Sequence, residues 1–331
     1  MITVEIELLQ VTYGDCIFIH ITTDDTTFTI LMDGGPKSAY CKKERMRLVP
    51  GCLQRKLDAM KEAGKHIDLL IITHVDEDHI GGLKEWFEQD FPSMDFVKEI
   101  WLNDDVEIAD VTDKRNTSAK AASLLKLLEE KGMKHRNRIV AGMRENYSWG
   151  QIKVLAPNVD DHNVIAHDIK KELKNAGTST KYQKSIKDYL KEDYTRDTVT
   201  PENDASIAIL LQTRDGENDL FLGDACISTI MDSIESDNKI EKPLHCKWVK
   251  LSHHGSKNNF LPSLLDLITV ENFVFSTDGS YYGHPDKEVL SQLVEKTDAN
   301  LCFNYVKRGQ QMITKQDKQD YPQLLDRIKP I

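Results

Sequence analysis

The chain has 331 residues, of which 40% are hydrophobic and 29% charged, and its formal net charge is −11. This is the composition of a globular protein, and it excludes a largely disordered chain. The negative charge argues against a protein that coats DNA, although a locally basic channel or bound cations would still admit a phosphate.

The N-terminal third is expected to contain strands followed by alternating strands and helices. Short apolar, β-branched runs predict strands, and apolar residues at helical spacing predict helices. The expected strands are Val4–Val11, Cys16–Ile21, Phe28–Met32, Leu69–Thr73 and Glu99–Leu102, and the expected helices are Cys52–Ala63, Ile80–Phe87 and Thr117–Lys131.

The middle of the chain, residues 158–202, is polar, rich in Lys and Asp and poor in large apolar residues. This pattern predicts an insertion or a lid, partly helical at 168–176 and 182–190. Strands are then expected at Ala205–Gln212, Asp219–Leu222, Lys247–Leu251, Asn272–Phe275 and Asn300–Tyr305, with a helix at Asp286–Lys296. The order of elements predicts two sheets packed on each other with helices outside.

The cysteines and the N-terminus indicate where the protein resides. The six cysteines contain no CxxC pair, as is typical of reduced thiols. The segment MITVEIELLQ is acidic, so we expect no signal peptide, and no apolar run is long enough for a membrane span. We therefore expect a cytoplasmic protein whose metal ligands, where present, are His and carboxylates.

The strongest chemical signal is the segment Thr73-His74-Val75-Asp76-Glu77-Asp78-His79-Ile80-Gly81-Gly82. It lies between a predicted buried strand and a predicted helix, so its side chains can converge. Imidazoles and carboxylates are ligands for zinc, manganese or iron. An acidic helix N-terminus is the alternative, because the helix dipole favours Asp and Glu there. That alternative explains neither histidine nor the two glycines.

Four further segments place polar residues after apolar strands or in a loop. Asp33 follows Leu31-Met32, and Asp224 lies in Phe221-Leu222-Gly223-Asp224. His253 and His254 lie in Leu251-Ser252-His253-His254-Gly255-Ser256, and His284 lies in Tyr281-Tyr282-Gly283-His284-Pro285. Taken singly, these are ordinary turns, a surface histidine pair and a loop histidine; together they form an ordered set.

This ordered set resembles the metallo-β-lactamase superfamily. Within it, the chain resembles the hydrolase domain of the competence protein ComEC and its stand-alone relatives. The segments Val11-Thr12-Tyr13-Gly14-Asp15-Cys16 and Asn203-Asp204-Ala205-Ser206 belong to the same resemblance. It implies an α/β fold, an αββα sandwich with a polar insertion, as a single domain over residues 1–331.

The resemblance also implies the roles of individual residues. His74 and Asp76 would hold one metal ion, Asp78, His79 and His253 the other, and Asp224 would bridge them. Asp33 would lie beneath the site and support the loop of the HVDEDH motif. Asp78 and His284 would be catalytic, and His254, Ser256 and Asn203 would contact substrate.

Two departures from the family pattern affect the metal. Asp76 stands where the family usually has a second histidine, and a carboxylate there makes manganese plausible beside zinc. A third ligand histidine before Asp224 is missing. Asn203 or Asp204 would substitute, or the first ion would bind weakly. The expected cofactors are two divalent ions, Zn or Mn.

The predicted function is a phosphodiesterase or nuclease that acts on DNA, RNA or a nucleotide. A lysine-rich segment, with six lysines and one acid between Lys170 and Lys187, is compatible with a phosphate backbone or simply with a solvated helix face. The alternatives are a hydrolase of a cyclic nucleotide, thioester or lactam, and a non-catalytic metal-binding interaction module. A protein partner or a homo-oligomer is left open.

Overall fold

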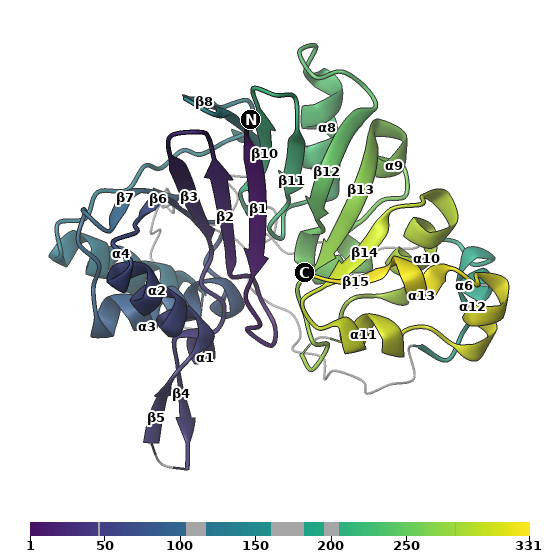
Figure 1. Cartoon of the computed structure of the whole chain (residues 1–331), viewed down its shortest axis with the longest axis horizontal. Helices are drawn as coiled ribbons and strands as arrows, with labels where there is room; N and C mark the ends of the chain where they lie inside the picture. Colours follow the sequence, from purple (N-terminus) through teal and green to yellow (C-terminus); the bar gives the residue numbers. More distant parts are fainter. Residues whose placement is uncertain (46, 104–116, 160–181, 195–204, 282) are drawn as a thin grey trace. The chain divides into compact units, whose positions relative to one another are not determined.

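The computed structural model describes residues 1–45, 47–103, 117–159, 182–194, 205–281 and 283–331 (Figure 1). The chain divides into two compact units. Unit 1 comprises Met1–Val140 and Val159–His167, and unit 2 comprises Ala141–Asn158 and Asp168–Ile331. Each unit has its own sheet and its own hydrophobic core, so each is described by itself.

A five-stranded sheet forms the centre of unit 1, with the strand order β1-β2-β3-β6-β7. Its first three strands are antiparallel neighbours, and β3, β6 and β7 run parallel. Parallel neighbours need crossover connections, which here carry the helices. The strands are β1 (Thr3–Leu8), β2 (Ile17–Thr22), β3 (Thr27–Met32), β6 (Ile67–Ile72) and β7 (Val97–Leu102).

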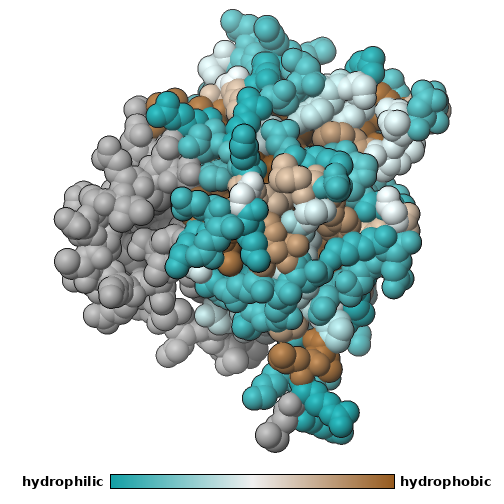
Figure 2. All heavy atoms as spheres, turned by 90° about the vertical axis from the view of Figure 1, so that its left-hand side faces the viewer, coloured by the Kyte–Doolittle hydropathy of each residue, from teal (hydrophilic) through white to brown (hydrophobic). Residues whose placement is uncertain are grey.

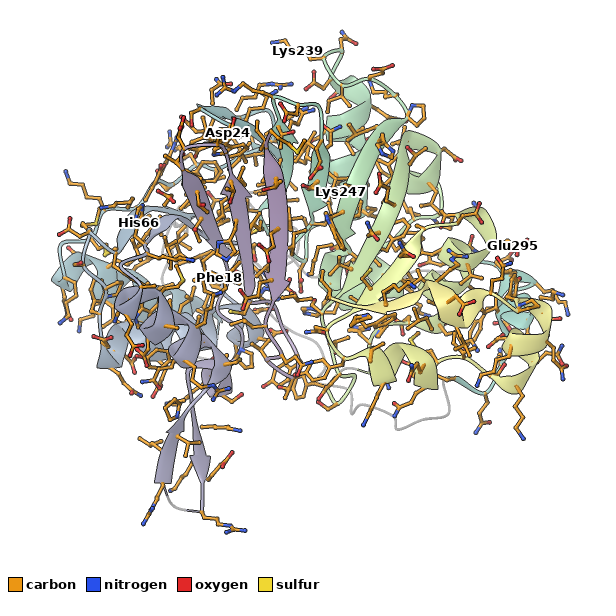
Figure 3. The ribbon with its side chains drawn as sticks, in the orientation of Figure 1. Phe18, Asp24, His66, Lys239, Lys247 and Glu295 are labelled. Carbon is orange, nitrogen blue, oxygen red and sulfur yellow. The ribbon has the colours of Figure 1, made fainter. Side chains whose placement is uncertain are left out.

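Helices cover one face of this sheet. They are α1 (Lys37–Tyr40), α2 (Cys52–Glu62), α3 (Glu77–Gln89) and α4 (Thr117–Glu130). The apolar stripe of α2, formed by Leu53, Leu57 and Met60, belongs to the same core as Phe18 of β2. Figure 3 labels Phe18, which is fully buried, and Asp24, which is exposed at the turn between β2 and β3.

A two-stranded hairpin extends from the helices of unit 1 (Figure 1). Its strands are β4 (Cys41–Glu44) and β5 (Arg47–Pro50). In Figure 2, hydrophobic spheres at the bottom of the view lie above hydrophilic ones, and of the hairpin residues Leu48 is strongly exposed.

Unit 2 contains an eight-stranded sheet with the order β15-β14-β13-β12-β11-β10-β9-β8. The strands from β11 to β15 run parallel to one another, and β8 to β11 are antiparallel neighbours. The strands are β8 (Arg144–Tyr147), β9 (Gly150–Ala156), β10 (Ala208–Thr213), β11 (Asn218–Phe221), β12 (Leu244–Lys250), β13 (Ile268–Phe275), β14 (Asn300–Phe303) and β15 (Ile328–Pro330).

The helices of unit 2 bury their apolar residues in one core with this sheet. For example, Ile227, Ile230 and Ile234 of α8 have helical spacing and are fully buried. The helical elements are α6 (Ile186–Leu190), α8 (Ile227–Ser236), the 3₁₀ turns η2 (Ser252–Gly255) and η3 (Lys257–Asn259), α9 (Leu264–Leu267), α10 (Lys287–Lys296), α11 (Val306–Gln311), α12 (Lys315–Asp320) and α13 (Leu324–Arg327).

The predicted mixed α/β class is confirmed, and its architecture is consistent with the fold that the sequence resembles. The single domain stays a prediction. The insertion at 158–202 also stays a prediction, because most of that segment lies outside the described residues. The helix expected at 168–176 lies there too, and the helix expected at 182–190 is shorter and begins at Ile186. Among the described residues, no helix has the length and apolar character needed to cross a membrane.

Candidate metal centre

The HVDEDH segment of unit 1 connects the end of β6 to the start of α3. Asp76 is the N-cap residue of α3, and Glu77 and Asp78 lie in its first turn. The acidic helix N-terminus considered from the sequence is therefore present, and the helix dipole favours these carboxylates. It does not account for His74 and His79, which are both buried, with ring centroids 4.1 Å apart.

Asp33 organises this segment from the end of β3. It is fully buried and has the left-handed backbone φ of 57°. Its Oδ1 accepts a hydrogen bond from the backbone N–H of Thr73 at 2.8 Å, and its Oδ2 accepts one from the Thr73 hydroxyl at 2.6 Å. The same Oδ2 lies 2.7 Å from Nδ1 of His79.

These contacts fix which nitrogen of each histidine can bind a metal. The Asp33 carboxylate accepts the Nδ1 proton of His79, so Nε2 carries the lone pair. Because the Thr73 hydroxyl donates to Asp33, its oxygen accepts from Nδ1 of His74, 3.0 Å away. One buried carboxylate therefore sets the tautomer of both histidines.

The Nε2 atoms of these histidines lie close to carboxylate oxygens. Nε2 of His74 is 3.7 Å from Oδ2 of Asp76, and Nε2 of His79 is 3.9 Å from Oδ2 of Asp78. Two atoms that each lie about 2.1 Å from one ion at a tetrahedral angle are about 3.4 Å apart. The observed separations are too long for hydrogen bonds and close to those of ligands that share an ion.

Unit 1 contains a further carboxylate at this place that sequence reasoning did not select. Asp15 is 1% exposed, and its carboxylate, that of Asp33 and a ring nitrogen of His79 all lie within 4.8 Å of one another. In the sequence, Asp15 belongs to the segment Val11-Thr12-Tyr13-Gly14-Asp15-Cys16 of the resemblance, which assigns it no role. Its one local signal is the apolar run Cys16–Ile19 that follows it, which predicts a strand.

Gly14 permits this close arrangement. Its φ is +87°, and a Cβ atom built on it would lie 1.8 Å from the carbonyl oxygen of Asp78. The next residue, Asp15, donates its backbone N–H to that same oxygen at 3.2 Å. Any side chain at position 14 would therefore displace the turn that carries Asp78.

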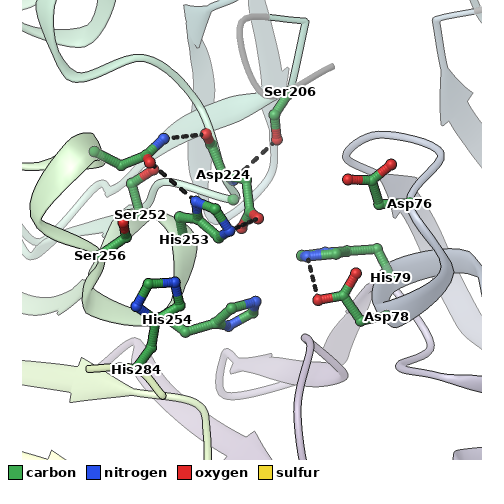
Figure 4. Close-up of polar contacts among 12 residues, drawn as sticks. Asp76, Asp78, His79, Ser206, Asp224, Ser252, His253, His254, Ser256 and His284 are labelled. Carbon is green, nitrogen blue, oxygen red and sulfur yellow. Dashed lines mark hydrogen bonds and ion pairs between the residues drawn. The ribbon is translucent and has the colours of Figure 1, made fainter. Parts of the chain in front are cut away.

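Asp224 is the first candidate ligand of unit 2 and follows β11. It is 2% exposed, and its backbone N–H donates to Oγ of Ser206 at 3.0 Å (Figure 4). Its backbone carbonyl accepts from Nδ2 of Asn259 at 2.8 Å. The strand end and these two bonds hold the carboxylate in a fixed position.

His253 and His254 follow β12 in the turn η2, and both have left-handed φ values, 46° and 55°. Such values are strained for residues other than glycine and are common at functional sites. Nδ1 of His253 contacts Oδ1 of Asn259 at 3.0 Å, and Nδ1 of His254 contacts Oγ of Ser276 at 2.9 Å. These contacts again leave the two Nε2 atoms for metal or substrate.

Both histidines are near Asp224. Nε2 of His253 is 3.7 Å from Oδ2 of Asp224 (Figure 4), and ligand atoms of His254 and Asp224 lie within 4.8 Å of each other. The amide of Asn259 donates to Asp224 and faces His253 with its oxygen, so its orientation is fixed by hydrogen bonding. The structure thus offers His254 as well as His253 as a ligand.

His284 lies beside His253 in unit 2, with ring centroids 5.1 Å apart. Its Nδ1 is 3.3 Å from Oδ2 of Asp286. Burial lowers the pKa of His284 below its ordinary value, Asp286 opposes this effect, and the neighbouring histidines add to it.

The backbone of the His284 loop is held by two side chains. Arg308 donates to the carbonyl oxygens of Gly283 at 2.9 Å and His284 at 3.1 Å. The Tyr182 hydroxyl donates to the carbonyl oxygens of Gly283 at 3.1 Å and Pro285 at 2.8 Å, and its ring lies 4.7 Å from the guanidinium carbon of Arg308. The direction of the imidazole is thereby fixed by residues far away in the sequence.

Two predicted substrate contacts remain predictions. Ser256 is buried, and its hydroxyl accepts from the backbone N–H of Asn258 at 3.3 Å, so it caps the turn η3. Asn203 lies outside the described residues, as does Asp204. Sequence reasoning did not select Asn259, Ser276, Asp286 or Arg308, because nothing in their local sequence marks them as partners of a histidine.

Residues 9–92 match the family model of the metallo-beta-lactamase superfamily. The matched segment contains Asp15, Asp33 and the HVDEDH segment. A search of curated proteins finds no match to the chain. Most members of the superfamily are metal-dependent hydrolases, and the histidine and aspartate groups described above are donors that divalent metals accept. The match and the donors together indicate a metal-dependent hydrolase.

Proposed function

We propose that the chain is a phosphodiesterase that hydrolyses DNA or RNA with two divalent ions, Zn or Mn. The ligands would be His74, Asp76, Asp78, His79, Asp224 and His253. One observation carries this assignment: His74, His79 and His253 each have Nδ1 held by a neighbour and Nε2 within 3.7–3.9 Å of a carboxylate oxygen. The resemblance to the ComEC branch supports the choice of nucleic acid as substrate.

The donor set fits divalent ions of borderline hardness. Three imidazole nitrogens suit zinc, and the three aspartates shift the preference toward manganese. When bound, two such ions lower the pKa of a water molecule and stabilise negative charge on a phosphoryl oxygen. Asp15 lies near His79, so it would be a candidate for a further ligand of the ion that Asp78, His79 and His253 hold.

The protein's own residues would supply the remaining steps. Asp78 at the start of α3 orients the attacking water and accepts its proton. His284 contacts a non-bridging phosphate oxygen or protonates the leaving oxygen. A bound phosphate places negative charge beside His284 and raises the pKa of its imidazole, which burial lowers in the substrate-free protein. Asp286, whose Oδ2 lies 3.3 Å from Nδ1 of His284, would hold the imidazole by charge so that Nε2 is left for the substrate.

The first test is a hydrolysis assay with plasmid, single-stranded DNA, RNA and cyclic nucleotides, each with Mn²⁺, Mg²⁺ or Zn²⁺. The Asp78→Ala variant should lose hydrolysis while its fold is retained, since Asp78 would serve both a metal and the water. A variant that keeps about a tenth or more of wild-type turnover would contradict the assigned role. Hydrolysis of cyclic nucleotides but of none of the polymers would show that the substrate is a small molecule.

The second test separates the two roles of His284. His284→Ala should keep wild-type metal content and lose about 10²–10⁴-fold in rate on an unactivated phosphodiester. Bis-p-nitrophenyl phosphate has a good leaving group and should suffer less if His284 donates a proton. Equal losses on both substrates indicate phosphate binding instead. Loss of metal would make His284 a ligand.

One observation favours a small substrate as the second candidate. The chain has a net charge of −11, and such a surface repels a polyanion on average. A cyclic nucleotide, thioester or lactam meets less of this repulsion than a polymer does. The β4–β5 hairpin of unit 1, with four cations and one acid, opposes this repulsion locally and favours the polymer.

A further inference from the structure

The β4–β5 hairpin concentrates positive charge in an acidic protein. Residues 41–50 contain Lys42, Lys43, Arg45 and Arg47 and the single acid Glu44, so their net charge is 4 − 1 = +3. The whole chain carries −11, so the rest of it carries −11 − 3 = −14. Clustered cations on an otherwise acidic surface attract polyanions locally.

Three of these cations are available to a ligand. Lys42 pairs with Glu44 at 2.7 Å. Lys43, Arg45 and Arg47 are exposed, and none of them forms an ion pair with any residue that the structure describes. An exposed cation without a carboxylate partner gives up little on binding a phosphate, because no existing ion pair has to break.

The strand register places the charges on both sides of the hairpin. Opposite residues of antiparallel strands share a face. Lys43 is opposite Leu48, and Glu44 is opposite Arg47. With Arg45 at the end of the hairpin, cations therefore line its length and tip, which suits an extended anion rather than a single phosphate.

The root of the hairpin is fixed to the helices of unit 1. A Cβ atom at Gly51 would lie 2.0 Å from the carbonyl oxygen of Ala39, so the chain is in close contact there. Arg55 of α2 donates to the carbonyl oxygen of Pro50 at 2.6 Å, and the Cys41 thiol donates to Glu85 of α3 at 3.3 Å. The root thus packs on α3, the helix whose first turn contains Asp78.

The hairpin is long enough to meet a bound polymer. Four residues at about 3.3 Å each make strands of about 13 Å. Figure 1 shows the hairpin extending from the helices α1 to α3, with no other described helix or strand of unit 1 beside its outer part. A root that packs on α3 keeps the orientation of the hairpin constant relative to the HVDEDH segment of the same unit.

We propose that Lys43, Arg45 and Arg47 of this hairpin bind the phosphate backbone of a single-stranded nucleic acid. The inference rests on the proposed function, in that the bound strand would be the polymer that the hydrolase cleaves. A membrane is the less favoured partner, because Leu48 is the one large apolar side chain of the described hairpin residues that is strongly exposed, at 69%. Stable membrane attachment takes much more apolar surface than this.

The test measures binding of the full-length protein to a fluorescent phosphorothioate DNA strand of about 20 nucleotides. Such a strand keeps one charge per phosphate and resists hydrolysis. The variant carries Lys43→Gln, Arg45→Gln and Arg47→Gln. The matched control carries Lys315→Gln, Lys318→Gln and Lys329→Gln, which removes the same charge from exposed positions of unit 2.

The hairpin variant should bind about tenfold or more weakly at about 0.1 M salt. The slope of log affinity against log salt should fall by about 2, since each phosphate contact on a single strand contributes about 0.7. The control should keep at least half of the wild-type affinity and the wild-type slope. Thermal melting checks that each variant is folded, and the single variant Arg47→Gln, with an expected slope change of about 0.7, replaces the triple variant if that one unfolds.

Equal slopes for the wild type and the hairpin variant would overturn the inference, as would equal losses in the hairpin variant and the control. Hairpin-dependent binding to phosphatidylserine vesicles without an effect on DNA would overturn it in favour of a membrane. The proposed hydrolase activity fails separately: a wild-type protein that binds the strand through the hairpin but cleaves no phosphodiester keeps this inference and loses the proposed function. A protein that cleaves bis-p-nitrophenyl phosphate but binds no strand would keep the proposed hydrolase activity and lose this inference.

Discussion

Replacement of Asp33 by Asn should weaken metal binding while the fold persists. Asn has nearly the same shape as Asp, but it presents an N–H₂ group where the carboxylate presents its second oxygen. With its oxygen kept on the backbone N–H of Thr73, the amide nitrogen faces both the Thr73 hydroxyl and Nδ1 of His79. His79 must then accept at Nδ1 and carry its proton on Nε2, the nitrogen that would bind the metal.

The reversed hydrogen bonding also changes the tautomer of His74. A Thr73 hydroxyl that accepts from the amide turns its proton toward Nδ1 of His74, 3.0 Å away. The flipped amide is no better, because its N–H₂ group would then face the N–H of Thr73 and leave two buried donors unsatisfied. Loss of such a supporting carboxylate costs about 10–100-fold in metal affinity, or about 1.4–2.7 kcal/mol. The hydrogen bonds to residue 33 also become weaker, because their acceptor is no longer charged, and this should lower the free energy of unfolding by about 1–2 kcal/mol.

Competition with a chromogenic chelator measures the affinity for Zn²⁺ and Mn²⁺, and thermal melting of the metal-free protein measures the fold. Asp219→Asn is the matched control. Asp219 is equally buried in unit 2 and accepts the backbone N–H of Trp248 at 3.0 Å, but it contacts none of the proposed ligands. A metal affinity of Asp33→Asn within about twofold of the wild type would refute the tautomer argument.

Three other changes have definite expected outcomes. Gly14→Ala should lower stability by about 1–3 kcal/mol and reduce metal content, because its Cβ would lie 1.8 Å from the carbonyl oxygen of Asp78. Arg308→Ala should lower kcat on an unactivated phosphodiester about tenfold or more without loss of metal, since the carbonyl oxygen of His284 loses its donor. Burial raises the pKa of Asp219 to about 7, so between about pH 4 and 7 the folded state binds a proton that the unfolded state does not. The stability that this proton contributes to the wild type is lost as the pH rises through this range. Because Asp219→Asn has no such proton, its melting temperature relative to that of the wild type should rise from pH 5 to pH 8.

Controls and contrary outcomes sharpen these three predictions. Gly216 has φ +91° but open space around its Cβ position, so Gly216→Ala tests backbone strain alone; equal effects at positions 14 and 216 would remove the role of the close contact. Arg308→Lys keeps the charge with a single donor group and should restore only part of the rate. Unchanged kinetics in Arg308→Ala would show that the loop needs no anchor. A melting difference for Asp219→Asn that does not vary with pH would argue against a buried, titrating carboxyl group.

Regular elements with a strong local pattern are predictable from the sequence. Thr117–Lys131 was expected as a helix, and α4 covers Thr117–Glu130. The strand β8 (Arg144–Tyr147) has no apolar alternation, and nothing in its sequence marks it. Among the described strands it lies at the edge of its sheet, beside β9. The hairpin of β4 and β5 was also missed. Its charged residues have no strand pattern, and contacts at its root with α2 and α3 position it.

The candidate site likewise has residues that the sequence predicts and residues that it does not. Histidines and aspartates at strand ends are visible because their residue types and positions are unusual, so the proposed ligands could be named before the structure. Asp15 was not selected, since Gly14-Asp15 is an ordinary turn pair until Asp33 and His79 are seen beside it. The residues that orient the histidines, such as Asn259 for His253, come from segments with no ligand-like pattern, and only tertiary structure brings them into contact.

Metal analysis combined with a cleavage assay on the same preparation tests the central claim most directly. The wild-type protein, reconstituted with Zn²⁺ or Mn²⁺ and then desalted, should hold about two equivalents of metal and cleave single-stranded DNA or RNA. Both properties should disappear together on treatment with EDTA and return together when the metal is restored. Metal below about 0.2 equivalents with full cleavage in EDTA would contradict the account, because the paired histidine and aspartate side chains would then have no ion to hold.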